Sequence, residues 1–368
     1  MNIPAGFSAN CVEAKDNKNY FDVQEYIKKL NNIVPQNVVN YAKDKYREFC
    51  EVAEEDINRK IDYKSLKIGK GFFIYDVERR AGQISDFYFK ITDDVGLVGV
   101  IEIVETNQGM ECVFSDSLNY ILSSNDTSSG FYYRENGVIN YMDCSSLKNI
   151  SKFSLDETIE RKEFKSKSLI DKLKIMYYNT KTLKVIDISD YNAGDGMQEG
   201  YTPNFSVDTQ GKKVCNTGNY MVDQEGKEIC WAACVASIYN YFYNKHITAK
   251  QVSKNVIGGY KGASYKTVLK AFSMYNMDIY KHTDYSLKYN QIKTNISHMR
   301  LPCMTGYNQI SSHDIVLTGY AYTNNNEKIK VYDPAENAWK WLEHHAGKTV
   351  FSSNGDVYRW GASYYVYK

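Results

Sequence analysis

Residues 224–243 join a polar, glycine-containing loop to an apolar run that begins at a cysteine. They read Q-E-G-K-E-I-C-W-A-A-C-V-A-S-I-Y-N-Y-F-Y, and Ala233, Ile238 and Phe242 recur at roughly helical spacing. This pattern predicts a buried helix that begins near Cys230. A cysteine at a helix N-terminus is stabilised as the nucleophilic thiolate by the helix dipole and by the unpaired N–H groups of the first turn.

Gln224 lies six positions before Cys230, and a loop of that length can fold back onto the start of the helix. The Gln224 side-chain amide and the Cys230 backbone N–H would then be the two donors of an oxyanion hole. The alternative is an ordinary structural cysteine, because free cysteines are among the most buried residues. We expect Cys234, one helical turn later, to lie in the core.

The pattern Q-x5-C-W-A, with the cysteine opening a helix, resembles that of the papain-like cysteine peptidases. The variant C-W-A-A-C is most similar to compact bacterial members, the staphopain–streptopain group and related secreted effector proteases. The resemblance implies a nucleophile at Cys230, an oxyanion donor at Gln224, and a histidine and an acid farther along the chain.

His313 opens an apolar run, H-D-I-V-L-T-G-Y-A-Y, that predicts a strand and resembles the H-x5-G-Y histidine strand of this family. A strand start at a cleft edge can present an imidazole to a thiol. Asp333 ends the next predicted strand, K-I-K-V-Y-D-P, where it could fix the tautomer and orientation of the histidine. Asn337 is the fallback for this role, and Trp339 or Trp341 could either shield the pair from water or belong to the core.

The first half of the chain shows the patterns of a separate α+β module. Residues 17–58 predict two helices, the second beginning at Pro35, and short β-branched and aromatic runs between 66 and 142 predict an antiparallel meander. A charged helical stretch follows at 154–173. No histidine occurs before His246, so the module carries no acid–base constellation.

Residues 187–213 lack clear periodicity and are rich in Gly, Asp, Asn, Ser and Thr, which is typical of a linker. We therefore expect an N-terminal domain at 1–200 and a catalytic domain at 201–368. The linker is either an ordered crossing loop or an exposed processing site, since such segments are preferred sites of nicking. The order of helices and meander before the enzyme resembles the propeptides of staphopain and streptopain zymogens, which implies an inhibitory prodomain.

The expected catalytic domain has a helical first half and a strand-rich second half. After the Cys230 helix, short helices are predicted within 247–260, ending at Gly258, and within 263–278. Strand patterns return from Arg300 and continue to the end of the chain. The predicted fold class is therefore α+β, with a papain-like order of elements behind an α+β propeptide domain.

The amino-acid composition argues against several classes of binding partner. Lys and Arg number 45 and Asp and Glu 44, so no global field attracts nucleic acid or membrane. No apolar run reaches the ~20 residues of a membrane span. The eight cysteines are scattered without zinc-site spacing, and neither a metal nor a cofactor is expected.

The resemblance thus implies a secreted bacterial cysteine endopeptidase, made as a latent precursor, and we expect it to act as a monomer on protein or peptide substrates. No signal peptide is visible, so secretion would require a leader removed from the chain, and a cytoplasmic location is the alternative. Two other functions stay open: a transferase or deamidating toxin that uses the same thioester, and a binding module with a degenerate peptidase domain.

Overall fold

The computed structural model describes residues 20–21, 34–54, 56–57, 59–76, 86–106, 109–115, 130–135, 138–143, 153–154, 168, 171–173, 209–323 and 326–368. We call the described residues between 34 and 143 the N-terminal unit and those between 209 and 368 the C-terminal unit. The predicted domain boundary near 200 and the predicted first helix lie outside the described residues, as does nearly all of the predicted charged helix.

A single 12-stranded sheet runs through both units in the strand order β11-β17-β12-β13-β14-β15-β6-β5-β4-β2, with β10 paired to β13 and β16 paired to β17. Its strands are β2 (Lys67–Ile68), β4 (Asp86–Asp93), β5 (Gly96–Thr106), β6 (Gly109–Ser115), β10 (Thr209–Val214), β11 (Asp278–Thr283), β12 (Cys303–Tyr307), β13 (Ser312–Thr323), β14 (Asn326–Asp333), β15 (Ala338–Glu343), β16 (Val350–Ser353) and β17 (Asp356–Tyr367). All pairings within it are antiparallel. The fold is therefore α+β with a mostly antiparallel sheet, as the sequence predicted.

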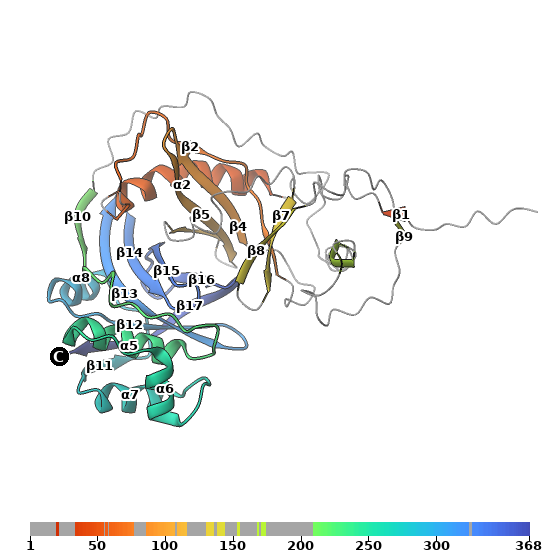
Figure 1. Ribbon diagram of the computed structural model, residues 1–368. Coiled ribbons are helices and arrows are strands. Elements are labelled where there is room, and N and C mark those ends of the chain that lie inside the picture. The colour runs from red at the N-terminus through yellow and green to blue at the C-terminus, as the bar shows by residue number, and fades with distance from the viewer. Residues whose placement is uncertain are drawn as a thin grey trace, which may run out of the picture.

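The two units meet where β15 pairs with β6, and we call this junction the seam. Lys340, Trp341 and Leu342 stand opposite Ser115, Phe114 and Val113. Beside the seam, Trp341 and Ala321 of the C-terminal unit lie in the same hydrophobic core as the N-terminal strands and α2 (Gln36–Ala53). Figure 1 shows α2 lying across the N-terminal strands, with β13 and β14 continuing the sheet below it.

In the N-terminal unit, the helix predicted to begin at Pro35 is confirmed, with Pro35 as the residue that precedes α2. Strands β4, β5 and β6 form the predicted antiparallel meander. The prediction was wrong for β3 (Ile74–Asp76), which pairs in parallel with β7 (Gly130–Glu135) in a small separate sheet completed by β8 (Val138–Asp143). Parallel pairing requires a long connection, and the meander strands β4 to β6 lie between the two in sequence.

Another two-stranded pairing joins β1 (Tyr20–Phe21) to β9 (Phe153–Ser154). The predicted linker was also wrong at its end, because residues 209–213 belong to β10, which pairs with β13. Among the described helices, none is long and apolar enough to cross a membrane.

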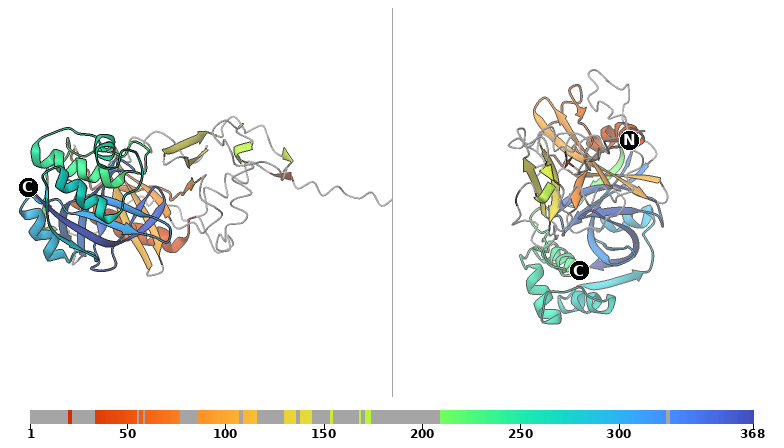
Figure 2. Two further views of the ribbon diagram at one scale, coloured as in Figure 1. Left: turned by 90° about the horizontal axis from the view of Figure 1, so that it is seen from below. Right: turned by 90° about the vertical axis from the view of Figure 1, so that its right-hand side faces the viewer.

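The C-terminal unit carries four helices within the described residues: α5 (Cys230–Tyr243), α6 (Ala249–Ile257), α7 (Tyr265–Met274) and α8 (Tyr289–Ser297). Thr248 and Gln251 form a capping box at the start of α6, and Gly258 ends it with a φ of 73°, so the predicted start and stop signals are confirmed. Figure 2 shows α5, α6 and α7 gathered at one end of the molecule, away from the N-terminal strands.

Candidate active site

Helix α5 begins at Cys230, as the sequence predicted, and presents that residue at the edge of a buried core. The preceding residue, Ile229, and the following Trp231 are both buried, whereas Cys230 is half-buried. Cys234 is fully buried, and burial raises the pKa of its thiol well above the usual value. Of the two cysteines on this helix, only Cys230 combines the helix start with partial exposure.

His313 and Asp333 form a buried hydrogen-bonded pair on neighbouring strands. The His313 Nε2 lies 2.8 Å from the Asp333 Oδ1, and the two residues are 6% and 1% exposed. His313 lies near the start of β13 and Asp333 ends β14, and these strands pair in antiparallel fashion. The structure therefore brings these two predicted site residues together, 20 positions apart in sequence.

The Cys230 side chain lies near enough to the His313 imidazole to contribute to the rise of its pKa. Burial lowers the pKa of His313, but the charge of Asp333 and the hydrogen bonds to Asp333 and Cys230 raise it to about 10. Because Nε2 faces Asp333, Nδ1 is the ring nitrogen left for the thiol. An imidazolium held in this way stabilises a thiolate beside it.

Asp333 is kept ionised by its surroundings. Burial raises the pKa of its carboxyl group, but the charge of Lys340 and the charge and hydrogen bond of His313 lower it below the ordinary range. The Lys340 Nζ lies 3.2 Å from Oδ2, and the Ala335 backbone N–H donates to Oδ1 at 2.9 Å. Asn337, the alternative orienter, lies in the following turn and accepts a hydrogen bond from Tyr332 instead.

The loop before Cys230 turns sharply after Gln224. Gln224 donates its backbone N–H to the Pro334 carbonyl at 2.9 Å, and Glu225 and Gly226 turn the chain with φ values of 49° and 66°. The Gln224 side chain is half-buried, and its Oε1 is a buried atom without a hydrogen-bond partner among the described residues. Gln224 thus lies at the turn that carries Asp333, next to the start of α5.

Two aromatic rings beside His313 were missed by the sequence analysis. The ring centroids of Phe351 and Tyr358 lie 6.2 and 5.5 Å from the imidazole. Both belong to the β16–β17 hairpin, whose Asn354-Gly355 turn between two apolar runs was a usable signal. Neither predicted tryptophan takes this place: Trp341 lies in the core against α2, and Trp339 packs on Tyr332.

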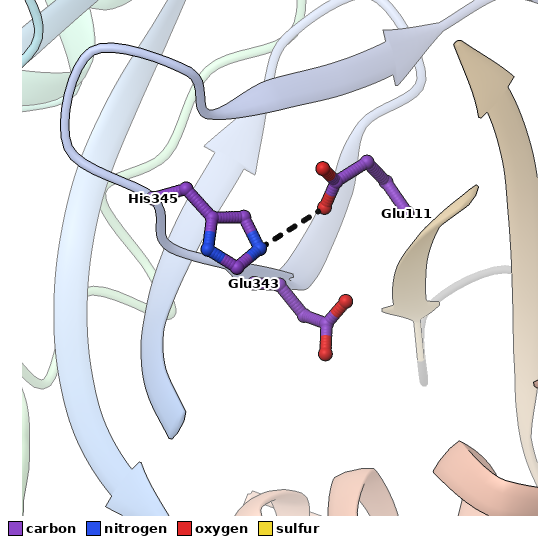
Figure 3. A group of neighbouring side chains, drawn as sticks. All are labelled: Glu111, Glu343 and His345. Atoms are coloured by element: carbon purple, nitrogen blue, oxygen red, sulfur yellow. Dashed lines mark ion pairs between the residues drawn. The ribbon is translucent and has the colours of Figure 1, made fainter. Parts of the chain in front are cut away.

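A second group of polar side chains lies across the seam, as Figure 3 shows. Glu111, Glu343 and His345 could together offer a metal ion three ligand atoms. Glu343, however, already bonds the Lys45 ammonium through one oxygen and the Tyr41 hydroxyl through the other. The nearby lysine charge and the occupied oxygens disfavour a cation, so we interpret the group as an ion-pair cluster.

Residues 212–346 match the family model described as papain-like cysteine protease AvrRpt2. The matched segment contains the loop, helix and strands that carry four residues: Gln224, Cys230, His313 and Asp333. It ends before the β16–β17 hairpin, which supplies the aromatic rings beside the histidine. No curated protein matches the chain.

Proposed function

We propose that this chain, which is a papain-like cysteine peptidase and therefore a hydrolase, cleaves internal peptide bonds of proteins through a thioester at Cys230. The observation that carries the proposal is the geometry of three side chains. The imidazole of His313 lies 2.8 Å from the Asp333 carboxylate, and the side chain of Cys230, which opens α5, is near enough to contribute to the raised pKa of that imidazole.

In the proposed reaction, the Cys230 thiolate attacks the peptide carbonyl and forms a tetrahedral oxyanion. The Gln224 side-chain amide and the Cys230 N–H donate hydrogen bonds to that oxygen. The His313 imidazolium then protonates the leaving amine as the C–N bond breaks, which leaves a thioester and a neutral imidazole. His313 next removes a proton from water, which hydrolyses the thioester and restores the thiol. Asp333 keeps the imidazole oriented throughout.

Peptide hydrolysis and the alternative reactions would share the Cys230 thioester. A transferase would pass the acyl group to an amine instead of water, and a deamidase would attack a side-chain amide instead of a peptide bond. The burial of His313 and Asp333 supports catalysis away from bulk solvent, and Cys230 is the partly exposed member of the three. An intact set of Gln224, Cys230, His313 and Asp333 opposes the reading of a degenerate peptidase domain. The grouping with staphopain and streptopain, the secreted bacterial setting and the monomeric state belong to the same proposal.

The test is to cut the chain between residues 187 and 208, dilute it so that the proposed restraint is released, and incubate it with a thiol-directed epoxide and with peptide libraries. We expect the epoxide on Cys230, and peptide products with a new free carboxylate and a new free amine. Products in which a glutamine side chain has become glutamate, or in which an added amine has been joined to the acyl group, would favour the alternative reaction. An unlabelled Cys230 in folded protein would overturn the assignment of the nucleophile.

We further propose that the N-terminal unit restrains this enzyme as part of a latent precursor. Support comes from its docking on the C-terminal unit through the seam and from the approach of Arg134 to Glu336, 3.9 Å apart, three positions after Asp333. Because His313 and Asp333 are already paired in the docked arrangement, the restraint would act by covering the substrate cleft and would leave the pair assembled.

A further inference from the structure

Lys340, on β15, is a buried lysine that touches the acid of the proposed site. It is 1% exposed, and its Nζ lies 3.2 Å from the Asp333 Oδ2, 2.9 Å from the Glu336 Oε2 and 2.7 Å from the Ser352 carbonyl oxygen. An ammonium group has three N–H donors, and these three acceptors use all of them. The side chain is therefore held in one place, against the oxygen of Asp333 that does not face His313.

The contacts of Lys340 continue across the seam into the N-terminal unit. Glu336, its second partner, lies 3.9 Å from the Arg134 guanidinium on β7, and both side chains are buried. Burial lowers the pKa of Lys340, but the charges of Glu336, Asp333 and Glu102 raise it above its ordinary value. Glu102 is a buried residue of β5 that accepts a hydrogen bond from the Tyr88 hydroxyl at 3.0 Å.

Burying these charged side chains costs free energy of folding. Each charge loses hydration on burial, and a buried ion pair often stabilises a fold less than apolar side chains of the same size would. The charges alternate along the network, which runs from Arg134 through Glu336, Lys340 and Asp333 to His313. The groups that face this network from neighbouring elements are His313 on β13, Asp86 and Tyr88 on β4, Glu102 on β5 and Ser352 on β16.

We infer that Lys340 is a positioning residue for the proposed peptidase, because it holds the Asp333 carboxylate ionised and aimed at His313. Arg134 of the N-terminal unit neutralises Glu336 and so keeps the Lys340 ammonium beside Asp333. The inference rests on the proposed function of this site. Burial raises the pKa of the Asp333 carboxyl group, and the positive charge of Lys340 offsets that effect. Without Lys340 the carboxyl group therefore takes up a proton at higher pH. A protonated Asp333 no longer favours the imidazolium, and the thiolate beside it loses its partner.

The test compares Lys340→Met with Lys328→Met in the full chain. Lys328 is a matched control, because it is also buried and pairs across the seam with Glu48 at 2.9 Å, but it does not touch Asp333. The readout is the alkylation rate of Cys230 by iodoacetamide between about pH 3 and pH 9. A small reagent reports the thiolate–imidazolium pair even where a larger substrate is excluded.

For Lys340→Met, we expect the acid side of the alkylation profile to move to higher pH by about one unit or more, the size of shift that one close charge gives a buried carboxyl. Lys328→Met should keep the wild-type profile, whatever it does to stability. Identical profiles for Lys340→Met and wild type would overturn the inference. Equal shifts in both variants would also overturn it, because they would reduce Lys340 to a structural role.

The part of the inference that concerns the N-terminal unit has its own pair of variants. In Arg134→Met, Lys340 is the remaining cation of this network beside Glu336. We expect the alkylation profile of Cys230 to move in the same direction as for Lys340→Met, but by less. Arg59→Met is the control, since Arg59 pairs with Asp93 inside the N-terminal unit. An unshifted profile for Arg134→Met would remove the N-terminal unit from the positioning of Asp333.

The outcomes separate this inference from the proposed function. Wild-type protein that shows the pH-dependent alkylation of Cys230 but cleaves no peptide under any condition would contradict the peptidase and leave the role of Lys340 standing. Wild-type protein that cleaves peptides, together with a Lys340→Met variant of unchanged profile, would contradict the inference alone.

Discussion

The Gln224 backbone N–H donates to the carbonyl of Pro334 at 2.9 Å, which ties the loop before the nucleophile to the turn after the acid. The two segments are far apart in sequence, and a single main-chain hydrogen bond joins them directly. A second bond, from the Val222 N–H to the Ser237 Oγ at 2.9 Å, fixes the same loop to α5. The first bond joins main-chain atoms only, so substitutions of the Gln224 side chain leave it intact.

The two cysteines of α5 should behave oppositely. Cys230→Ala should abolish thioester formation, because it removes the sulfur, whereas Cys234→Ala should keep most activity, at some cost in stability from a small cavity. Epoxide labelling followed by peptide mapping measures both. Label on Cys234 in the wild-type protein would contradict the assignment.

Gln224→Ala should lower kcat by roughly 10²–10³, the loss typical of one oxyanion donor. KM should change little, since the contact strengthens only as the oxyanion forms. The backbone bond to Pro334 survives this substitution, so the loop stays in place. Gln251→Ala, in the capping box of α6, is the control and should leave kcat near the wild-type value. Unchanged kcat in Gln224→Ala would remove its oxyanion role.

Substitutions of His313 and of Asp333 should reduce activity to different extents. His313→Ala should be nearly as damaging as Cys230→Ala, because the histidine handles the proton and the two act as a unit. Asp333→Ala should be milder, because the acid orients the base without exchanging the proton. The buried His344, held by Glu327 and the Leu287 carbonyl, is a control of the same residue type. Single-turnover kinetics would measure all three, and equal losses in His313→Ala and His344→Ala would contradict the roles.

The raised pKa of His313 predicts a pH dependence of stability. In the folded chain this pKa is about 10, above its ordinary value of 6.5, so the folded state holds the proton more tightly than the unfolded state. Its contribution to the free energy of unfolding is fully present below pH 6.5 and is lost as the pH rises towards 10. Urea titrations of wild type and His313→Gln across this range should converge at high pH. Parallel curves would contradict the shift.

Latency can be tested by placing a cleavage site for a specific protease between residues 187 and 208. We expect the intact chain to be nearly inactive at every concentration, because an attached unit acts at high effective concentration. After cutting, activity per molecule should rise on dilution as the N-terminal unit dissociates. Full activity in the demonstrably uncut chain would remove the precursor hypothesis and leave the assignment of Cys230 and His313 untouched.

Local signals in the sequence predicted the elements that carry the site. The apolar run after Cys230, the strand patterns at His313 and before Asp333, and the caps at Thr248 and Gly258 each depend on neighbours within a few residues. The structure forms an element at each of these places. The catalytic roles of Cys230, His313, Asp333 and Gln224 stay predictions.

What the sequence did not reveal depends on contacts between distant segments. The parallel pairing of β3 with β7 and the seam of β15 with β6 join residues that no short pattern links. The contact of Lys340 with Asp333 was missed for another reason. On an antiparallel strand of alternating polar and apolar residues, a lysine ordinarily marks the solvent face. Here Asp333, Glu336 and Ser352 of the C-terminal unit contact Lys340, and Glu102 of the N-terminal unit lies near it.

The seam also has a consequence for how the chain reaches its native state. In the C-terminal unit taken alone, β15 would present a row of unpaired N–H and C=O groups beside Trp341 and Leu342. An exposed apolar edge of this kind pairs readily with other chains and promotes aggregation. Strand β6 covers this edge in the intact chain, so we expect the N-terminal unit to assist the folding of the C-terminal unit. At the high protein concentrations used in refolding, residues 201–368 alone should precipitate, and supplying residues 1–200 as a separate chain should restore soluble protein; at the low concentrations of an activity assay, aggregation of the released part is slow.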